Sequence, residues 1–136
     1  MNSISKALSG NDVGATGAHQ AGVHIPKSNE EVLRFFPNLD PSQKNPSKII
    51  EFIRRDTSTT INLRFIYYNS AFFGGTRNEY RLTGLSSFLR EVGAKSGDHL
   101  IMSDEYGKYF IEVKDPSTSP KKLSIKLSGS WSTNGK

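Results

Sequence analysis

The chain has 136 residues, enough for one compact domain but not comfortably for two. Its net charge of +5 favours a polyanionic partner over an acidic or neutral one. The sequence contains no cysteine, which excludes disulfides, thiolate metal sites and cysteine nucleophiles. No apolar run approaches the ~18 residues of a membrane span, and no apolar run follows a basic start, so we expect neither a membrane partner nor a secretory signal.

The sequence predicts a series of short strands and two short helices. The clearest strand is 59–68, whose alternation puts Ile61, Leu63, Phe65 and Tyr67 on one face and Asn62, Arg64, Ile66 and Tyr68 on the other. A capping box at 28–31 opens a helix over 30–36, and a second helix begins at Ser86 and ends at Gly93 as a glycine C-cap. In chain order, the expected strands are 3–8, 20–25, 48–54, 59–68, 80–83, 99–103, 108–114 and 123–127.

These elements predict a mainly β fold, a small barrel or sandwich of about seven strands with two short helices. We expect one domain over residues 1–127. The last residues, 128–136, are rich in Ser, Gly and Asn, which is typical of a flexible linker or tail.

Two long polar loops, 8–22 and 67–81, lie between predicted strands. Both are too long and too rich in hydrogen-bond donors for simple turns, so we expect them to contact a ligand. The second loop places Arg77, Asn78, Glu79 and Arg81 almost side by side. In the major groove Arg recognises guanine, Asn recognises adenine and Glu accepts from cytosine. This cluster therefore indicates sequence-specific duplex DNA, although Glu79 could instead pair with one arginine on a solvated surface.

The first loop combines glycines, which allow close approach to a phosphate, with polar side chains. The functional interpretation is an arm that enters a groove, and the alternative is an ordinary hairpin loop. A dinucleotide site or P-loop is excluded by the glycine spacing. The candidate contact residues are Asn11, Asp12, Thr16, His19 and Gln20.

Both loops resemble the N-terminal DNA-binding domain of EcoRII-type restriction endonucleases. In the first loop the resemblance rests on residues 14–17 and on His19-Gln20, and in the second on residues 67–70 and 76–79. It is dense over 6–26 and 64–83. It implies an open, seven-stranded DNA-binding pseudobarrel. The unit that runs from the second helix through Lys95-Ser96-Gly97-Asp98 into a strand is likewise similar to the plant B-three domain.

The resemblance also implies how DNA is bound: two arms clasp the major groove and recognise CCWGG, where W is A or T. It assigns base reading to His19, Arg77, Asn78, Glu79 and Arg81. It assigns support to Arg64 and makes Lys6 and Thr16 candidates for backbone contact. From the loop composition we also expect backbone contact or support from Asn11, Asp12, Gln20, Tyr68, Asn69 and Thr76. Two positions depart from the family pattern, because Gly75 and Tyr80 stand where basic residues are expected.

Under this resemblance the chain is the effector-binding domain of a type IIE enzyme and has no catalytic residues of its own. Its partners are double-stranded DNA and a separate C-terminal nuclease domain in a bacterial cytoplasm. We expect no cofactor or metal here, and Mg²⁺ only in that nuclease domain. A stand-alone pseudobarrel transcription regulator and a protein-interaction barrel are alternatives.

A nuclease site within this chain is a further alternative. Glu112-Val113-Lys114, with Asp98 or Asp104 upstream, imitates the Asp…Glu-x-Lys pattern of Mg²⁺-dependent nucleases. This motif is weak evidence for a nuclease site, because Glu-x-Lys is an ordinary alternation on an amphipathic strand. The three histidines do not have the spacing of a zinc site.

Overall fold

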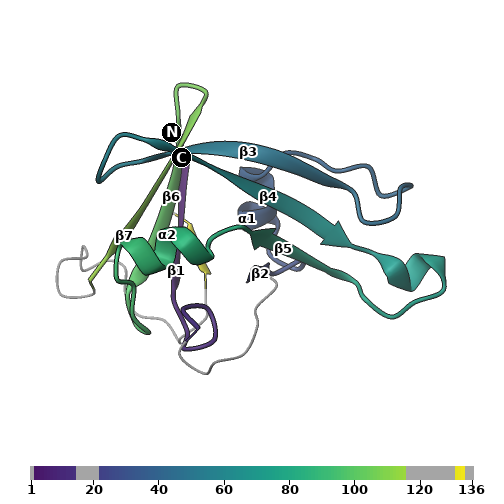
Figure 1. Cartoon of the computed structure of the whole chain (residues 1–136). Helices are drawn as coiled ribbons and strands as arrows, with labels where there is room; N and C mark the ends of the chain where they lie inside the picture. Colours follow the sequence, from purple (N-terminus) through teal and green to yellow (C-terminus); the bar gives the residue numbers. More distant parts are fainter. Residues whose placement is uncertain (1, 15–21, 116–130, 134–136) are drawn as a thin grey trace.

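One strongly curled sheet forms the body of the protein (Figure 1). The computed structural model describes residues 2–14, 22–115 and 131–133. The strand order across the sheet is β2-β5-β4-β3-β7-β6-β1-β8. In chain order the elements are β1 (Asn2–Ala7), β2 (Val23–Ile25), α1 (Glu30–Phe35), β3 (Ser47–Arg54), β4 (Thr60–Tyr68), the 3₁₀ helix η1 (Ser70–Phe73), β5 (Glu79–Thr83), α2 (Ser86–Glu91), β6 (His99–Glu105), β7 (Lys108–Lys114) and β8 (Trp131–Thr133).

The predicted fold class, a mainly β open pseudobarrel with two short helices, is confirmed. Seven strands, β1 to β7, make up most of the sheet, and among the strand pairs of the described residues only β3–β7 is parallel. The short strand β8 adds an edge next to β1. The Trp131 indole nitrogen donates to the His24 carbonyl at 3.2 Å. The two edge strands, β8 and β2, therefore face each other across the open side of the barrel.

The strand β8 corrects one prediction. Residues 128–136 were expected to be a flexible tail, but Trp131–Thr133 pair with β1. The backbone of β1 offers hydrogen bonds along its second edge, and this short segment takes them. The rest of the tail, the expected strand 123–127 and the boundary at residue 127 lie outside the described residues.

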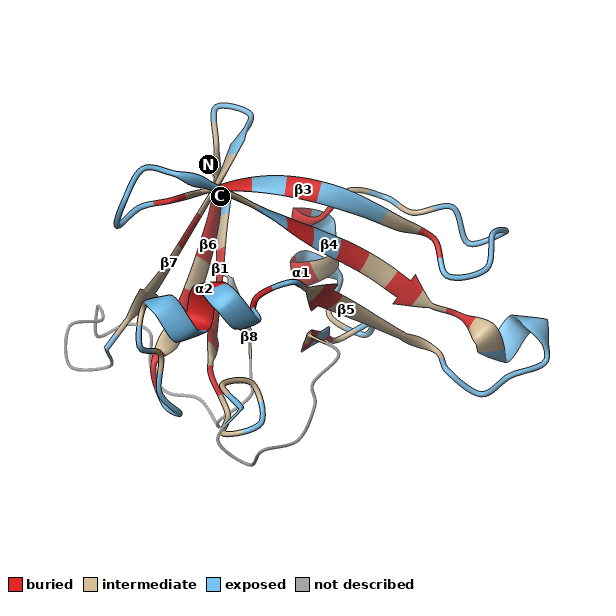
Figure 2. Cartoon of the chain, in the orientation of Figure 1, coloured by how far each residue is buried: buried red, intermediate tan, exposed pale blue. Residues whose placement is uncertain are grey.

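The buried core residues recur along the strands of the curled sheet and on both helices (Figure 2). On β4, Leu63, Phe65 and Tyr67 are buried, as the alternation predicted. Tyr67 and Tyr80, paired across β4 and β5, stack with ring centroids 4.2 Å apart. Phe36, just after α1, stacks on Phe65 at 4.5 Å. The same alternation that fills the core sends the intervening β4 and β5 side chains to the outer face.

Local capping residues determine where the two helices begin or end. The α1 N-cap is Asn29, whose side-chain oxygen accepts from the Val32 amide at 3.2 Å, so the cap lies one residue after the predicted Ser28. Asn caps as well as Ser, and it leaves both glutamates in the first turn. The glycine C-cap of α2 is confirmed: Gly93 has φ +69, and the Ala94 amide donates to the Leu89 carbonyl at 2.9 Å. Within the described residues, neither helix is long and apolar enough to cross a membrane.

Candidate nucleic-acid interface

The outer face of β2, β5 and β4 carries a set of polar side chains in register. Cross-strand pairing places Glu79 opposite Tyr68, and Arg81 opposite both Ile66 and His24. Because alternate residues of a strand share a face, these side chains lie on the side away from the core. β4 and β5 also continue beyond the barrel as a protruding hairpin, which we call the second arm (residues 67–81; Figure 1).

A single carboxylate on the second arm holds two arginines. Arg77 donates to Glu79 Oε2 from Nε at 3.0 Å and from Nη2 at 2.6 Å. Arg81 Nη2 lies 3.4 Å from the other oxygen, Oε1. The hydrogen bonds from Arg77, supported by the nearby Arg81 charge, lower the pKa of Glu79 below its ordinary value. Glu79 is therefore ionised at neutral pH and fixes both guanidinium groups.

Tyr68 gives Arg77 a second support. The guanidinium carbon of Arg77 lies 3.7 Å from the centre of the Tyr68 ring, which is cation–π stacking. Arg77 is still 43% exposed, so it is positioned by these contacts without being covered. The structure thus brings together four of the predicted residues, Arg77, Glu79, Arg81 and Tyr68, in one cluster.

Asn78 faces the other way from this cluster. Its side-chain oxygen accepts from the Tyr67 hydroxyl at 2.6 Å. Its backbone carbonyl accepts from Lys27 Nζ at 3.3 Å. Bidentate recognition of adenine uses both the oxygen and the nitrogen of an Asn amide. Asn78 would have to share its oxygen with Tyr67, or lose that bond, to contact adenine in this way.

Asn69 supports the second arm from within. It is fully buried, and its amide nitrogen donates to the Gln43 carbonyl at 2.8 Å and to the Pro41 carbonyl at 3.3 Å. Its side-chain oxygen accepts from the Asn45 amide at 2.7 Å. These bonds attach the connection 41–45 to the base of the arm. Asn69 is therefore a structural support without access to a phosphate.

The other predicted supports on this side are exposed. Arg64 lies on the outer face of β4 and donates to Ser47 Oγ at 2.9 Å. Thr76 lies at the tip of the arm. Both side chains are accessible for a contact with the DNA backbone.

The two departures from the family pattern have structural explanations. Tyr80 points to the core side of β5, where it stacks on Tyr67, so it lies on the opposite face from Glu79 and Arg81. At Gly75, an added Cβ would lie 2.6 Å from Ser70 Oγ, too close for any side chain unless Ser70 moves. Ser70 Oγ in turn accepts from the Arg77 amide at 3.1 Å. The missing cation at position 75 is therefore linked to the way this tip is folded.

The root of the first arm is a buried ion pair. Lys6 on β1 pairs with Asp12, and both side chains are less than one-tenth exposed. Asp12 also accepts from the Ser9 amide at 3.0 Å, and its own amide donates to Ser9 Oγ at 3.1 Å. Lys6 and Asp12 therefore shape the loop that follows β1. Asn11 is exposed beside them, whereas Thr16, His19 and Gln20 lie outside the described residues.

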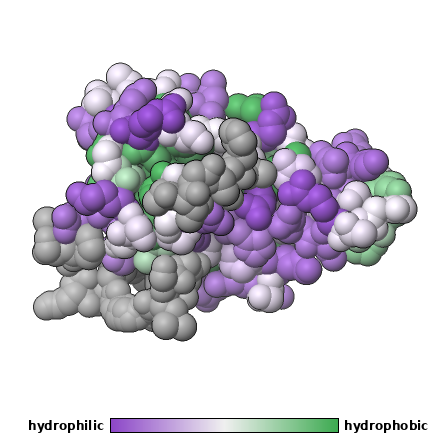
Figure 3. Space-filling model, turned by 60° about the horizontal axis from the view of Figure 1, so that its bottom comes forward, coloured by the Kyte–Doolittle hydropathy of each residue, from purple (hydrophilic) through white to green (hydrophobic). Residues whose placement is uncertain are grey.

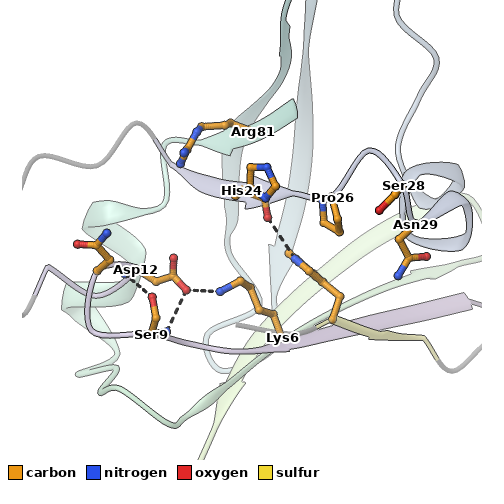
Figure 4. Close-up of a pocket in the computed structure, with 10 residues that line it drawn as sticks. Lys6, Ser9, Asp12, His24, Pro26, Ser28, Asn29 and Arg81 are labelled. Carbon is orange, nitrogen blue, oxygen red and sulfur yellow. Dashed lines mark hydrogen bonds and ion pairs between the residues drawn. The ribbon is translucent and has the colours of Figure 1, made fainter. Parts of the chain in front are cut away.

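A polar pocket of about 520 Å³ separates the first-arm root from β2 and β5 (Figure 4). Figure 4 shows Lys6, Ser9 and Asp12 on one side of it and His24 and Arg81 on the other. Arg81 Nη1 donates to the Gly22 carbonyl at 2.9 Å, while its buried Nε has no partner among the described residues. Burial and the Arg81 charge lower the pKa of His24. The pocket is lined by Lys6, Ser9, Asn11, Asp12, His24, Pro26, Ser28, Asn29, Arg81 and Trp131.

Gly22 connects the two arms. Its φ is +88, and a Cβ there would lie 2.3 Å from the Leu82 carbonyl oxygen. Only glycine fits this close approach to β5. The carbonyl that Arg81 binds is thus held by the end of the first arm, so the two arms share one contact.

The residues of the alternative nuclease site do not come together in one cluster. Glu112 lies 3.6 Å from Arg55 Nε and so faces a cation. The Asp98 carboxylate is buried and accepts from the Lys95 amide at 2.9 Å, which closes the turn before β6. Among the described residues, no cluster of three His, Asp or Glu side chains has the arrangement of a metal site.

Two residues of this surface, His24 and Lys27, were not predicted to belong to it. The histidines were interpreted from the sequence as surface or partly buried side chains without a zinc site, and the alternation of Val23, His24 and Ile25 does place His24 away from the core. Lys27 carries no sequence signal, because its contact with Asn78 spans 51 residues.

The curled sheet with two arm roots on one face defines a B3-type pseudobarrel. The solved Arabidopsis FUS3–DNA complex matches with a TM-score of 0.63 and 18% identity, covering 82% of this chain and 94% of that one. The B3 domain of the UbaLAI restriction endonuclease, solved with cognate DNA, matches with a TM-score of 0.61 and 19% identity, covering 97% and 85%. At these identities the likeness shows the fold.

The sequence model of the family described as "Restriction endonuclease EcoRII, N-terminal" matches residues 2–117. This chain belongs to that family. The type II restriction enzyme EcoRII of Escherichia coli is 44% identical over 80 residues. That match covers 57% of this chain but only 19% of EcoRII, so the chain corresponds to a small part of this relative.

Proposed function

We propose that this chain binds double-stranded DNA sequence-specifically, with its two loop arms in the major groove. The observation that carries the proposal is the Arg77–Glu79–Arg81 cluster at the protruding hairpin, in which Arg77 is exposed, Glu79 and Arg81 are partly buried, and the shared carboxylate holds both arginines in place. Preorganised side chains lose little freedom on binding, which favours affinity and sequence discrimination. The major groove admits a two-stranded ribbon of this kind.

In this proposal each group has a chemical role. Arg77 and Arg81 donate to guanine O6 and N7, while Glu79 orients them and accepts from a cytosine amine. Lys27, next to Asn78, and the exposed Arg64 contact phosphates and set the register. The first-arm residues Thr16, His19 and Gln20 lie outside the described residues, and their contacts with DNA stay a prediction from the sequence.

We further propose that the chain is the effector-binding domain of a type IIE-like restriction endonuclease in a bacterial cytoplasm. A CCWGG-like sequence is the proposed target, and a C-terminal nuclease domain that uses Mg²⁺ is the proposed partner. Family membership and the small share of EcoRII that the chain matches support this proposal. The chain itself would bind one copy of the sequence without cleaving it.

The test is binding to a short CCWGG duplex and to a scrambled duplex, at moderate salt, with and without Mg²⁺. The proposal expects tighter binding to CCWGG, the same affinity with Mg²⁺, and no cleavage. Equal weak binding to both duplexes would contradict sequence specificity. Cleavage with Mg²⁺ would contradict the effector role, and Glu112→Ala would then show whether Glu112 is responsible.

A further inference from the structure

Two adjacent phenylalanines are exposed at the tip of the second arm. Phe72 is 66% and Phe73 is 44% exposed, and both belong to η1. Figure 3 shows apolar surface gathered at this end of the molecule, next to a hydrophilic stretch. Exposing two aromatic rings side by side loses the free energy that their burial would contribute, so the pair requires an explanation.

Backbone hydrogen bonds at the tip of the second arm hold the two rings outward. The Gly75 amide donates to the Ser70 carbonyl at 2.6 Å, and the Ala71 amide donates to the Arg77 carbonyl at 2.8 Å. Gly74, at φ +91, turns the chain at the end of η1. The backbone of η1 is thus bonded directly to the backbone of Arg77. A position for Arg77 in the groove therefore also fixes where the rings lie.

The charge around the tip indicates what covers the rings. The segment 70–77 contains no acidic residue and ends in Arg77. A polyanion can therefore approach this tip without repulsion. In the major groove of a duplex, the apolar group at the base edges is the C5-methyl of thymine, and phenylalanine is one of the side chains that contact it.

We propose that Phe72 and Phe73 contact thymine C5-methyl groups in the major groove, beside the base pairs that Arg77 recognises. This inference rests on the proposed function and extends it: the second arm recognises thymine through apolar contact, in addition to guanine and cytosine through polar contact. Thymine preference would then appear at positions that no polar side chain of the arm reads.

The experiment is a double-mutant cycle that combines changes in the protein with changes in the DNA. Wild type, Phe72→Ala, Phe73→Ala and the double variant are titrated with CCWGG duplexes in which each thymine, inside and next to the site, is replaced in turn by deoxyuridine. Removing one buried methyl should weaken wild-type binding about fourfold at one or two positions. The double variant should bind the thymine duplex more weakly and show no difference between thymine and uracil at those positions.

Controls separate the tip from general effects. Tyr106 is fully exposed at positive φ in the β6–β7 turn, away from the arm, so Tyr106→Asn removes an exposed ring without touching the tip. It should keep the wild-type response to uracil. Thermal melts of all variants should coincide closely, because exposed rings contribute little to the core.

Three results would overturn the inference. In the first, wild type prefers CCWGG but is indifferent to every thymine-to-uracil change, which leaves the proposed function standing. In the second, the double variant is weakened equally on thymine and uracil duplexes, which would indicate contact with sugars or an effect on the arm. In the third, wild type does not prefer CCWGG at all, which removes the proposed function as well.

Discussion

Two arginine clusters, on opposite ends of the sheet, are built from similar parts and differ in charge. In the second arm, Arg77 and Arg81 share one carboxylate, Glu79, within the described part of the chain. At the end of β3, Arg54 pairs with Asp56 and Glu91, and Arg55 pairs with Glu105 and Glu112. Each cluster has an arginine over an aromatic ring, Tyr68 in one and Phe110 in the other.

The difference is the ratio of carboxylates to arginines. The second-arm cluster keeps a net positive charge on an exposed hairpin, which suits a polyanion. The β3 cluster is net negative and ties β3 to α2, β6 and β7, which suits a structural role. Arginine and aromatic content alone therefore does not distinguish the proposed interface from the β3 cluster, whereas the local charge balance does.

The largest expected effect comes from removing an arginine of the second-arm cluster, with an arginine of the β3 cluster as the control. Arg81→Ala should weaken binding to CCWGG by about 1–3 kcal/mol and relax the preference over a scrambled duplex. Arg77→Ala should do the same. Arg55→Ala should leave DNA affinity unchanged, because that cluster lies outside the proposed interface. Fluorescence titration with both duplexes measures all three variants.

Two outcomes would change this interpretation. If Arg81→Ala weakened binding equally on all sequences, Arg81 would be a phosphate contact. If Arg55→Ala weakened binding as much as Arg81→Ala, charge balance would not distinguish the two clusters.

A smaller effect is expected on stability from Glu79. Its pKa is lowered in the folded state, mainly by the hydrogen bonds from Arg77, so its contribution is present above the ordinary value of 4.5 and is lost as the pH falls through the folded value. Glu79→Gln should lower the free energy of unfolding by about 1 kcal/mol or less at pH 7, and the difference should disappear in acid. Urea unfolding at several pH values measures this. A difference that persisted after Glu79 is protonated in the folded protein would mean that the ion pairs are not its cause.

A still smaller effect concerns salt. Lys27 lies beside the second arm through its contact with the Asn78 carbonyl. Lys27→Ala should weaken binding about threefold at moderate salt and reduce the slope of log affinity against log salt by about one. Lys108→Ala, on the exposed start of β7, is the matched control and should leave the slope unchanged. An unchanged slope for Lys27→Ala would exclude a phosphate contact by this residue.

Where signals were local, the sequence was sufficient to predict the structure. The alternation over 59–68 predicted which β4 side chains enter the core, and Gly93 predicted the end of α2. The closeness of Arg77, Glu79 and Arg81 along the chain also made their cluster predictable, because residues two apart on a strand share a face.

Where partners lie far apart along the chain, prediction failed. The role of Asn69 depends on carbonyls 26 and 28 residues away. Glu112 imitated a metal ligand, because nothing near it in the sequence indicates that Arg55 pairs with it across the sheet.

One local signal was also ambiguous. The capping box was misplaced by one residue because Ser28 and Asn29 are both good N-caps, and local propensity does not decide between them.

The smallest expected effect tests charge balance directly by changing the β3 cluster. Replacing both Glu105 and Glu112 with Gln leaves Arg55 without its two carboxylates and turns the cluster from net negative to neutral, because Arg54 keeps Asp56 and Glu91. Nonspecific affinity for a scrambled duplex at low salt should then rise by about twofold, because removing negative charge reduces the repulsion of phosphates. The preference for CCWGG should not increase, because this surface has no protruding arm to reach base edges. A rise in sequence preference would mean that arginines on a flat sheet end can discriminate bases, and the protruding second arm would then not be what confers specificity.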